Sequence, residues 1–139
     1  MEVTTYDSSQ APKLKKDVAK FLFTHLEEFG DPIEDIENCL DYVYKNGGHI
    51  ILAKEKDDIL GAVVINETGM KGYIPENILV YIAVSKKARG RGLGKKLMNK
   101  SIEIASGDIA LHVEKDNPAR FLYEKVGFTN PYLEMRYKK

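Results

Sequence analysis

The stretch ILVYIAVSKKARGRGLGKKL, residues 78–97, joins an apolar run to three glycines that alternate with other residues among basic side chains. An apolar run of this kind is typical of a strand covered on both faces of a sheet. Leu93 and Leu97 begin an apolar spacing of three and four residues, which predicts a helix that ends near Gly107. The glycines therefore lie between a buried strand and a helix N-terminus, where free backbone N–H groups can bind an anion.

The residues after this stretch predict a second strand, a helix and a third strand. Residues 108–114 (DIALHVE) form the second strand, and the helix between it and the first makes a βαβ unit. Two strands joined in this way are expected to be parallel, with a right-handed crossover. A last helix is predicted from Asn117–Pro118 to Gly127, and a closing strand from Tyr132 to Tyr137.

The residues before the stretch predict a strand, two helices and a β-hairpin. Their ranges are 1–6 for the strand, 11–29 and 32–46 for the helices, and 49–54 and 59–66 for the hairpin strands. Asp31 is placed to cap the second helix, with Pro32 in its first turn. Because no repeat, linker or low-complexity segment interrupts the pattern, residues 1–139 are expected to form a single α/β domain with one mixed sheet.

The composition excludes several classes of protein. Lys plus Arg equal Asp plus Glu at 21 each, whereas a protein that binds nucleic acid through its overall field is clearly basic. One cysteine cannot form an intramolecular disulfide, and with three histidines a structural zinc site is not expected. No segment resembles a signal peptide or is long enough to span a bilayer, so we expect a cytoplasmic protein without a membrane partner.

The charge of the glycine turn also favours an anion. Residues 86–100 contain seven basic side chains and no acidic one. The spacing G-x-G-x-G differs from the G-x-G-x-x-G fingerprint of dinucleotide-binding folds, and the turn lacks the spacing and the Ser or Thr of a Walker A loop. A solvated basic face with a flexible turn is the simpler alternative.

A second motif, NPARFLYEKVGF at residues 117–128, adds to the evidence from the glycine turn. Its A-x-x-x-Y-x-x-x-G-F portion, together with Arg89-x-x-Gly92-x-Gly94 after an apolar strand, resembles the GNAT superfamily of N-acetyltransferases. The order of predicted elements resembles that family over essentially the whole chain. The resemblance implies a GNAT-like mixed sheet whose parallel βαβ unit is splayed where acyl-CoA binds.

The resemblance implies acetyl-CoA as co-substrate, with no metal and no covalent intermediate. Backbone groups of the strand and the turn would bind the cofactor, and N–H donors there would stabilise the oxyanion formed when an amine attacks the thioester. The residues that the resemblance assigns to cofactor binding are Ile82, Ala83, Val84, Arg89, Gly90, Arg91, Gly92, Leu93, Gly94, Lys95, Asn117 and Tyr123.

Tyr123 is the predicted general acid, because a phenol can give a proton to the leaving thiolate. Asn117 and Tyr123 are six residues apart, which predicts that both lie on nearly the same side of one helix. Both residues also have structural alternatives. Asn117 can cap the helix, and Tyr123 can be an ordinary core aromatic residue.

The general base stays unassigned. Some family members carry a glutamate early in the fourth strand, where this chain has Ile78. Glu76, Glu67, Tyr81 and His112 are candidates for a base that acts directly or through water, and none is compelling. His112 is better explained as a structural histidine, and Cys39 as a core residue.

The acceptor is predicted to be a primary amine, in a small molecule or a peptide, with additional positive charge. Seven acidic residues and no basic residue lie between Lys20 and Lys45, and the resemblance puts the junction of the two helices beside the acceptor entrance. Glu28 and Asp31 are the predicted acceptor residues at the junction, with Glu76 and Tyr81 as further substrate residues. Solvated helix faces explain the same charges without a ligand.

Two other functions compete with acetyl transfer. A binding module of the same fold would hold coenzyme A or an acyl-CoA as a sensor without catalysis, and the missing glutamate keeps this alternative open. A nucleic-acid binder with a basic loop is disfavoured by zero net charge and by the lack of aromatic residues within residues 86–100. The sequence leaves a homodimer open.

Overall fold

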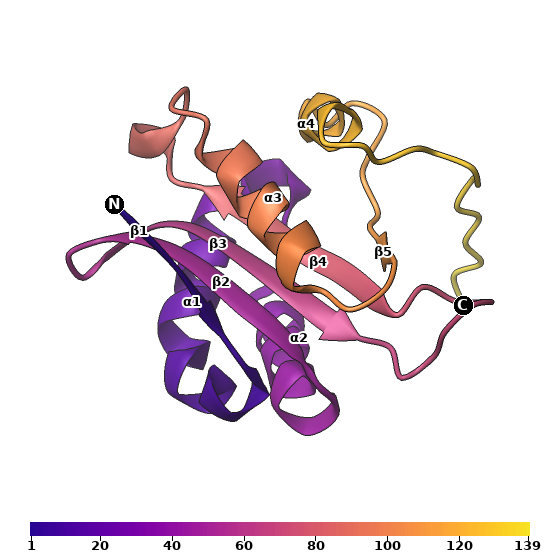
Figure 1. Cartoon of the computed structure of the whole chain (residues 1–139), viewed down its shortest axis with the longest axis horizontal. Coiled ribbons are helices and arrows are strands. Elements are labelled where there is room, and N and C mark those ends of the chain that lie inside the picture. Colours follow the sequence, from indigo (N-terminus) through magenta and orange to yellow (C-terminus); the bar gives the residue numbers. More distant parts are fainter.

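The computed structural model describes all 139 residues and contains one five-stranded sheet. Its strand order is β1-β2-β3-β4-β5, with β1 to β4 antiparallel and β5 parallel to β4 (Figure 1). The strands are β1 (Glu2–Tyr6), β2 (Gly48–Glu55), β3 (Asp58–Glu67), β4 (Asn77–Val84) and β5 (Ile109–Ala110). This arrangement confirms the predicted α/β class and the parallel βαβ unit.

Helices cover both faces of the sheet. They are α1 (Ala11–His25), α2 (Ile33–Asn46), α3 (Leu93–Ile104) and α4 (Ala119–Lys125), with short 3-10 helices η1 (Ser8–Gln10), η2 (Glu27–Phe29) and η3 (Lys86–Ala88). Helices α1 and α2 lie on one face and α3 and α4 on the other (Figure 1). No helix has the length and apolar content needed to cross a bilayer.

Alternation along the central strands produces two cores. Ile50, Leu52 and Val64 pack against α1 and α2, while Ile51 and Val63 pack against α3. All five side chains are fully buried, and successive residues of a strand point to opposite faces. Strands β2 and β3 therefore stabilise both layers of the molecule.

A β-bulge in β4 breaks this alternation. Tyr81 pairs with Val64 and Leu79 pairs with Ile65, so that Val80 is an extra residue without a partner of its own. Leu79 belongs to the core beneath α3, whereas Tyr81 belongs to the core beneath α1 and α2, although they are two residues apart. The bulge therefore turns Tyr81 toward the helix face opposite to that of Leu79.

Strands β4 and β5 separate soon after they meet. Only Asn77 and Ile78 of β4 pair with β5, at Ile109 and Ala110. Residues 108–114 were predicted to be a strand throughout, and the structure has only two of them in β5. The rest of β4 has no strand beside it on that side, which confirms the predicted splaying of the βαβ unit.

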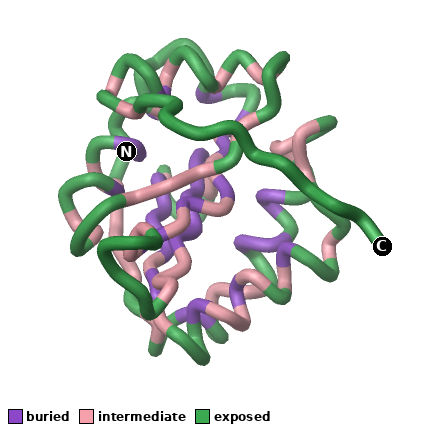
Figure 2. The backbone as a smooth tube through the Cα atoms, turned by 90° about the vertical axis from the view of Figure 1, so that its right-hand side faces the viewer, coloured by how far each residue is buried: buried purple, intermediate pink, exposed green.

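The predicted closing strand is wrong. Residues 132–137 form no strand, and Tyr132, Leu133, Met135 and Tyr137 are 82–91% exposed. Figure 2 shows this segment as an exposed tube that runs across the surface. An alternating pattern becomes a strand only where a partner strand supplies hydrogen bonds, and this segment has none.

Candidate active site

The glycine turn links the end of β4 to the start of α3. Gly90 and Gly92 have φ angles of 81° and 73°, and Gly92 is the left-handed residue directly before α3. A side chain at either position would meet no protein atom within 4 Å, so the turn is open on its outer side. These two glycines are therefore required by backbone conformation, while the space above them is left free.

The turn presents consecutive unpaired backbone donors. No backbone hydrogen bond from Gly90, Arg91 or Gly92 is found, and the first bond of α3 runs from the Lys96 N–H to the Gly92 carbonyl, at 3.2 Å. The N–H groups of the first helical turn before Lys96 have no intrahelical acceptor. This arrangement fits a phosphate group, because the donors are unpaired and lie at the positive end of the helix dipole.

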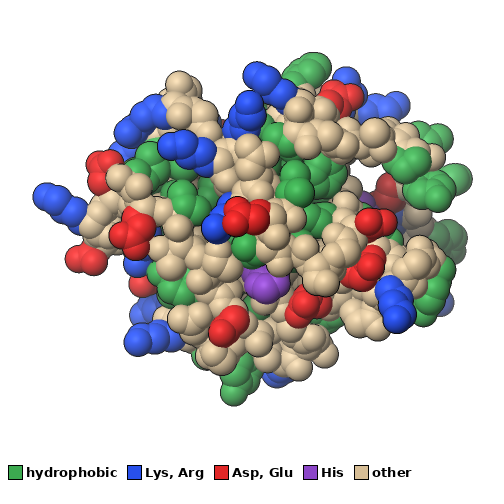
Figure 3. All heavy atoms as spheres, in the orientation of Figure 1, with side chains coloured by type: hydrophobic (Ala, Val, Ile, Leu, Met, Phe, Trp, Pro, Cys, Tyr) green, Lys and Arg blue, Asp and Glu red, His purple; other side chains and the backbone are tan.

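A shallow pocket of about 330 Å³ lies beside the turn. Its lining joins the end of β4, the turn and α4: Val84, Ala88, Arg89, Gly90, Gly92, Leu93, Gly94, Lys95, Leu122 and Lys125. A Cβ atom at Gly94 would lie 3.0 Å from Leu122 Cδ2, so a larger residue there would push the Leu122 side chain of α4 away by a few tenths of an ångström. Figure 3 shows basic side chains gathered over this end of the molecule.

Tyr123 packs in the core with Leu93 and Leu97 of α3 and does not line the pocket, although its neighbour Leu122 does. Its side chain is 7% exposed, and its ring centroid is 6.2 Å from that of Phe128. Burial raises the pKa of Tyr123 to about 12, with a smaller contribution from Glu114. The phenol is therefore protonated at neutral pH, which is the state that a general acid requires.

Asn117 takes the structural role. Its Oδ1 atom accepts a hydrogen bond from the Ala119 N–H at 2.9 Å, and its Nδ2 atom donates to Glu114 Oε1 at 3.1 Å. Helix α4 begins at Ala119, so Asn117 precedes the helix and the predicted shared helix side does not apply. A cofactor-binding role for Asn117 stays a prediction.

The structure brings together two of the predicted substrate residues. The Tyr81 hydroxyl donates a hydrogen bond to Asp31 Oδ2 at 2.5 Å, across 50 positions in the sequence. Burial raises the pKa of Tyr81, and this hydrogen bond and the nearby negative charge of Asp31 raise it further, so the phenol is not a base near neutral pH. Asp31 does not cap α2, because Pro32 occupies the cap position without a side-chain bond.

The other acceptor candidates lie apart. Glu28 is exposed in η2, and Glu76 precedes β4, where its Oε1 atom accepts a hydrogen bond from the Asp108 N–H at 3.3 Å. Glu76 is about 16 Å from Tyr81 along the strand, by the usual rise per residue.

His112 is exposed, so its interpretation as a satisfied structural histidine is wrong. Cys39 is half-buried against the α1–α2 core, and burial raises its pKa to about 12.

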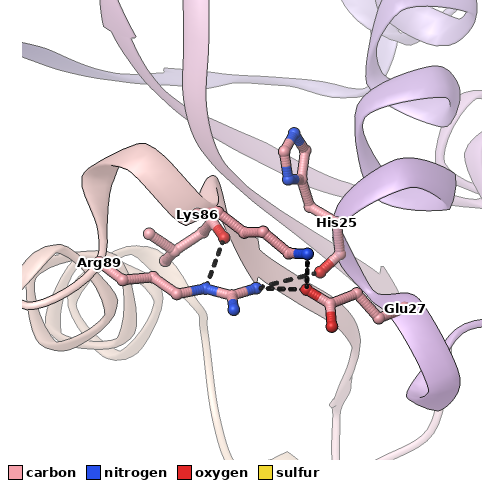
Figure 4. Close-up of polar contacts among 5 residues, drawn as sticks. His25, Glu27, Lys86 and Arg89 are labelled. Carbon is pink, nitrogen blue, oxygen red and sulfur yellow. Dashed lines mark hydrogen bonds and ion pairs between the residues drawn. The ribbon is translucent and has the colours of Figure 1, made fainter.

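Glu27 is a polar residue of this region that the sequence did not single out. Its Oε1 atom lies 3.3 Å from Arg89 and 3.6 Å from the Lys86 ammonium (Figure 4). No local pattern marks such a contact, since the partners are 62 and 59 positions away. No cluster of three or more His, Cys, Asp or Glu side chains is placed to hold a metal ion.

Comparisons with known proteins agree with this geometry. A family model described as "Acetyltransferase (GNAT) family" matches residues 15–128. The chain is 37% identical over 86 residues to 5-NmdU N-acetyltransferase of Pseudomonas phage PaMx11, covering 60% of this chain and 59% of the relative. It is 29% identical over 97 residues to N-alpha-acetyltransferase 30 of Schizosaccharomyces pombe, covering 63% and 65%. The chain therefore spans less than two thirds of either curated relative.

A solved structure resembles the whole chain. It is a Pyrococcus furiosus protein assigned provisionally as an acetyl transferase, with 26% identity and a TM-score of 0.64. The match covers 99% of this chain and 100% of that one. The resemblance therefore includes the glycine turn and both helix layers.

Proposed function

The chain belongs to the GNAT acetyltransferase family, and from this premise we propose that it transfers the acetyl group of acetyl-CoA to an amine within a ternary complex. That family uses acetyl-CoA as co-substrate. The observation that carries the proposal is the open glycine turn with its free N–H groups, placed where β4 leaves β5. Bare donors at a helix N-terminus fit the pyrophosphate of such a cofactor.

The glycine turn, the unpaired side of β4 and Tyr123 each have a role in this proposal. Gly90 to Lys95 bind the phosphates through backbone donors, and the unpaired side of β4 at Ile82–Val84 offers backbone groups to the acyl arm. Tyr123 holds the proton that the leaving thiolate needs. Burial raises the pKa of Tyr123 and would also raise that of a thiol bound beside it, so the raised phenol pKa does not by itself oppose proton transfer to the thiolate.

The acceptor is proposed from the residues of this chain, because the two relatives are named for different acceptors. Of the seven acids between Lys20 and Lys45, Glu27 contacts Arg89 and Lys86, and Asp41 pairs with Lys15 at 2.9 Å. Asp31 is exposed and held in place by Tyr81. Because Asp31 pairs with no basic side chain, its charge supports an acceptor amine that carries additional positive charge, in a small molecule or a peptide.

Thiol release tests the proposal. The chain is incubated with acetyl-CoA and a panel of polyamines, lysine peptides, basic N-terminal peptides and neutral amines. Acetyl transfer predicts free coenzyme A in proportion to acetylated amine. If coenzyme A binds and no amine releases thiol, the chain is instead the sensor module. The cytoplasmic location and the homodimer stay predictions.

A further inference from the structure

Glu27 joins the cofactor turn to the junction between α1 and α2. Its carboxylate contacts Arg89 and Lys86, which lie at the turn and in η3, and both contacts are made by the same oxygen atom (Figure 4). The Arg89 guanidinium also donates to the Val84 carbonyl at 3.3 Å and to the His25 carbonyl at 3.5 Å. Two cations beside the phosphate donors are therefore already engaged by a protein anion.

The backbone of Glu27 is in a conformation that glycine adopts more readily. Its φ angle is 55°, and Lys56 is the only other non-glycine residue with a positive φ. A left-handed conformation costs free energy for a residue with a Cβ atom and persists only where the surroundings maintain it. Glu27 is the first residue of η2, two residues after the end of α1, so the strained residue lies in the junction between α1 and α2.

The contacts are weak enough to be exchanged. The side chains of Glu27, Arg89 and Lys86 are 40%, 49% and 71% exposed, and exposed ion pairs contribute little to stability. A pyrophosphate brings more negative charge to the same cations and can also accept from the free N–H groups of the turn. A bound phosphate would therefore outcompete a single carboxylate.

We infer that Glu27 is a built-in competitor for the phosphates of the cofactor, which holds Arg89 and Lys86 in the free chain and is displaced when the cofactor binds. The inference rests on the proposed function, because it takes the turn to be a phosphate site. Displacement removes the ion pairs between η2 and the turn and lets Glu27 leave its strained conformation. The junction carries Asp31, the proposed acceptor residue, so cofactor binding releases one end of the acceptor site before the amine enters.

Binding of coenzyme A to variants tests the competition. Isothermal titration compares the wild type with Glu27→Gln, which keeps the size of the side chain and removes its charge. The control is Glu34→Gln, an exposed acid in the first turn of α2 that makes no ion pair. We expect Glu27→Gln to bind coenzyme A about two- to tenfold more tightly, and Glu34→Gln to stay within about twofold. Pantetheine, which lacks the phosphates, should bind the wild type and Glu27→Gln equally.

Equal or weaker binding of coenzyme A by Glu27→Gln would overturn the competition while leaving the turn as the cofactor site. Failure of the wild type to bind coenzyme A at all would instead overturn the proposed function.

Hydrogen exchange tests the release of the junction in the unaltered chain. The Phe29 and Gly30 N–H groups donate to the Leu26 and Glu27 carbonyls at 3.1 and 3.2 Å, so they report on η2 directly. Displacement of Glu27 predicts faster exchange at these two amides when coenzyme A is bound. Slower or unchanged exchange there would show that Glu27 stays in place, and the inference would be wrong.

Discussion

Residues 1–101 and residues 102–139 are held in the fold by different amounts of buried surface. The chain has 30 buried residues, and Tyr123 is the only one beyond Ser101. Strands β1 to β4 pair as long antiparallel ladders, whereas β5 pairs with β4 at two positions only. The first part therefore supplies most of the stability, and the second is placed around an opening of the sheet, where substitutions should change binding and catalysis more than folding.

Tyr123→Phe should give the largest effect and the sharpest separation of catalysis from stability. Loss of a general acid typically lowers turnover by about 10²–10⁴-fold. The ring stays packed, so the melting temperature and the dissociation constant for coenzyme A should change little. Because the pKa of Tyr123 is about 12, its ionisation should cause no loss of wild-type activity between pH 7 and 9. Full activity of the Phe variant over this range would leave Tyr123 a packing residue.

Leu52→Ala should show that the antiparallel part carries the stability. Leu52 is fully buried between the sheet and α1–α2, and truncation of such a leucine costs about 2–5 kcal/mol of unfolding free energy. The matched change Leu133→Ala, at a leucine that is 82% exposed, should stay within about 0.5 kcal/mol. Urea denaturation measures both. Comparable losses would mean that residues 129–139 pack in solution, and the contrast between the two parts would fail.

Gly92→Val should remove the stabilisation by coenzyme A. A ligand at one hundred times its dissociation constant stabilises the native state by about 2.7 kcal/mol. Valine at a φ of 73° is strained, and it fills the open space through which a phosphate approaches. Gly69→Val is the control, because Gly69 has a φ of 76° and equally open surroundings in the β3–β4 loop. Both variants should lose intrinsic stability, and Gly69→Val alone should keep the thermal shift. Equal shifts in Gly92→Val and Gly69→Val would contradict the assignment of the turn.

The double variant Glu28→Gln, Asp31→Asn should give the smallest effect. The amide introduced by Asp31→Asn keeps an oxygen that can accept the Tyr81 hydrogen bond, so the variant removes charge and retains the contact. We expect the KM for a dicationic amine to rise about threefold at low salt and less at high salt, with kcat unchanged. If neutral or carboxylate-bearing amines are the better acceptors in the panel, the acidic residues Glu28 and Asp31 do not select the acceptor amine.

Local patterns predicted most of the fold and the position of the glycine turn, which is one continuous stretch of the sequence. Apolar spacing located α1, α2 and α3, and the glycines located the turn, because each signal lies within one element. The closing strand failed because its alternating residues show strand propensity but contain no information about a partner edge. The contacts of Asp31 with Tyr81 and of Glu27 with Arg89 join elements far apart in the sequence, so no local pattern could predict them.

The bulge at Val80 makes one residue of β4 dispensable to the sheet. Without Val80, Leu79 and Tyr81 would still pair with Ile65 and Val64, and every other side chain of β4 would keep its face. A lineage that lost this single codon would keep the strand pairing and lose the partly buried contact of Val80 with the core beneath α1 and α2. The local bend and added twist that an inserted residue gives a strand would be lost, close to the point where β4 and β5 part.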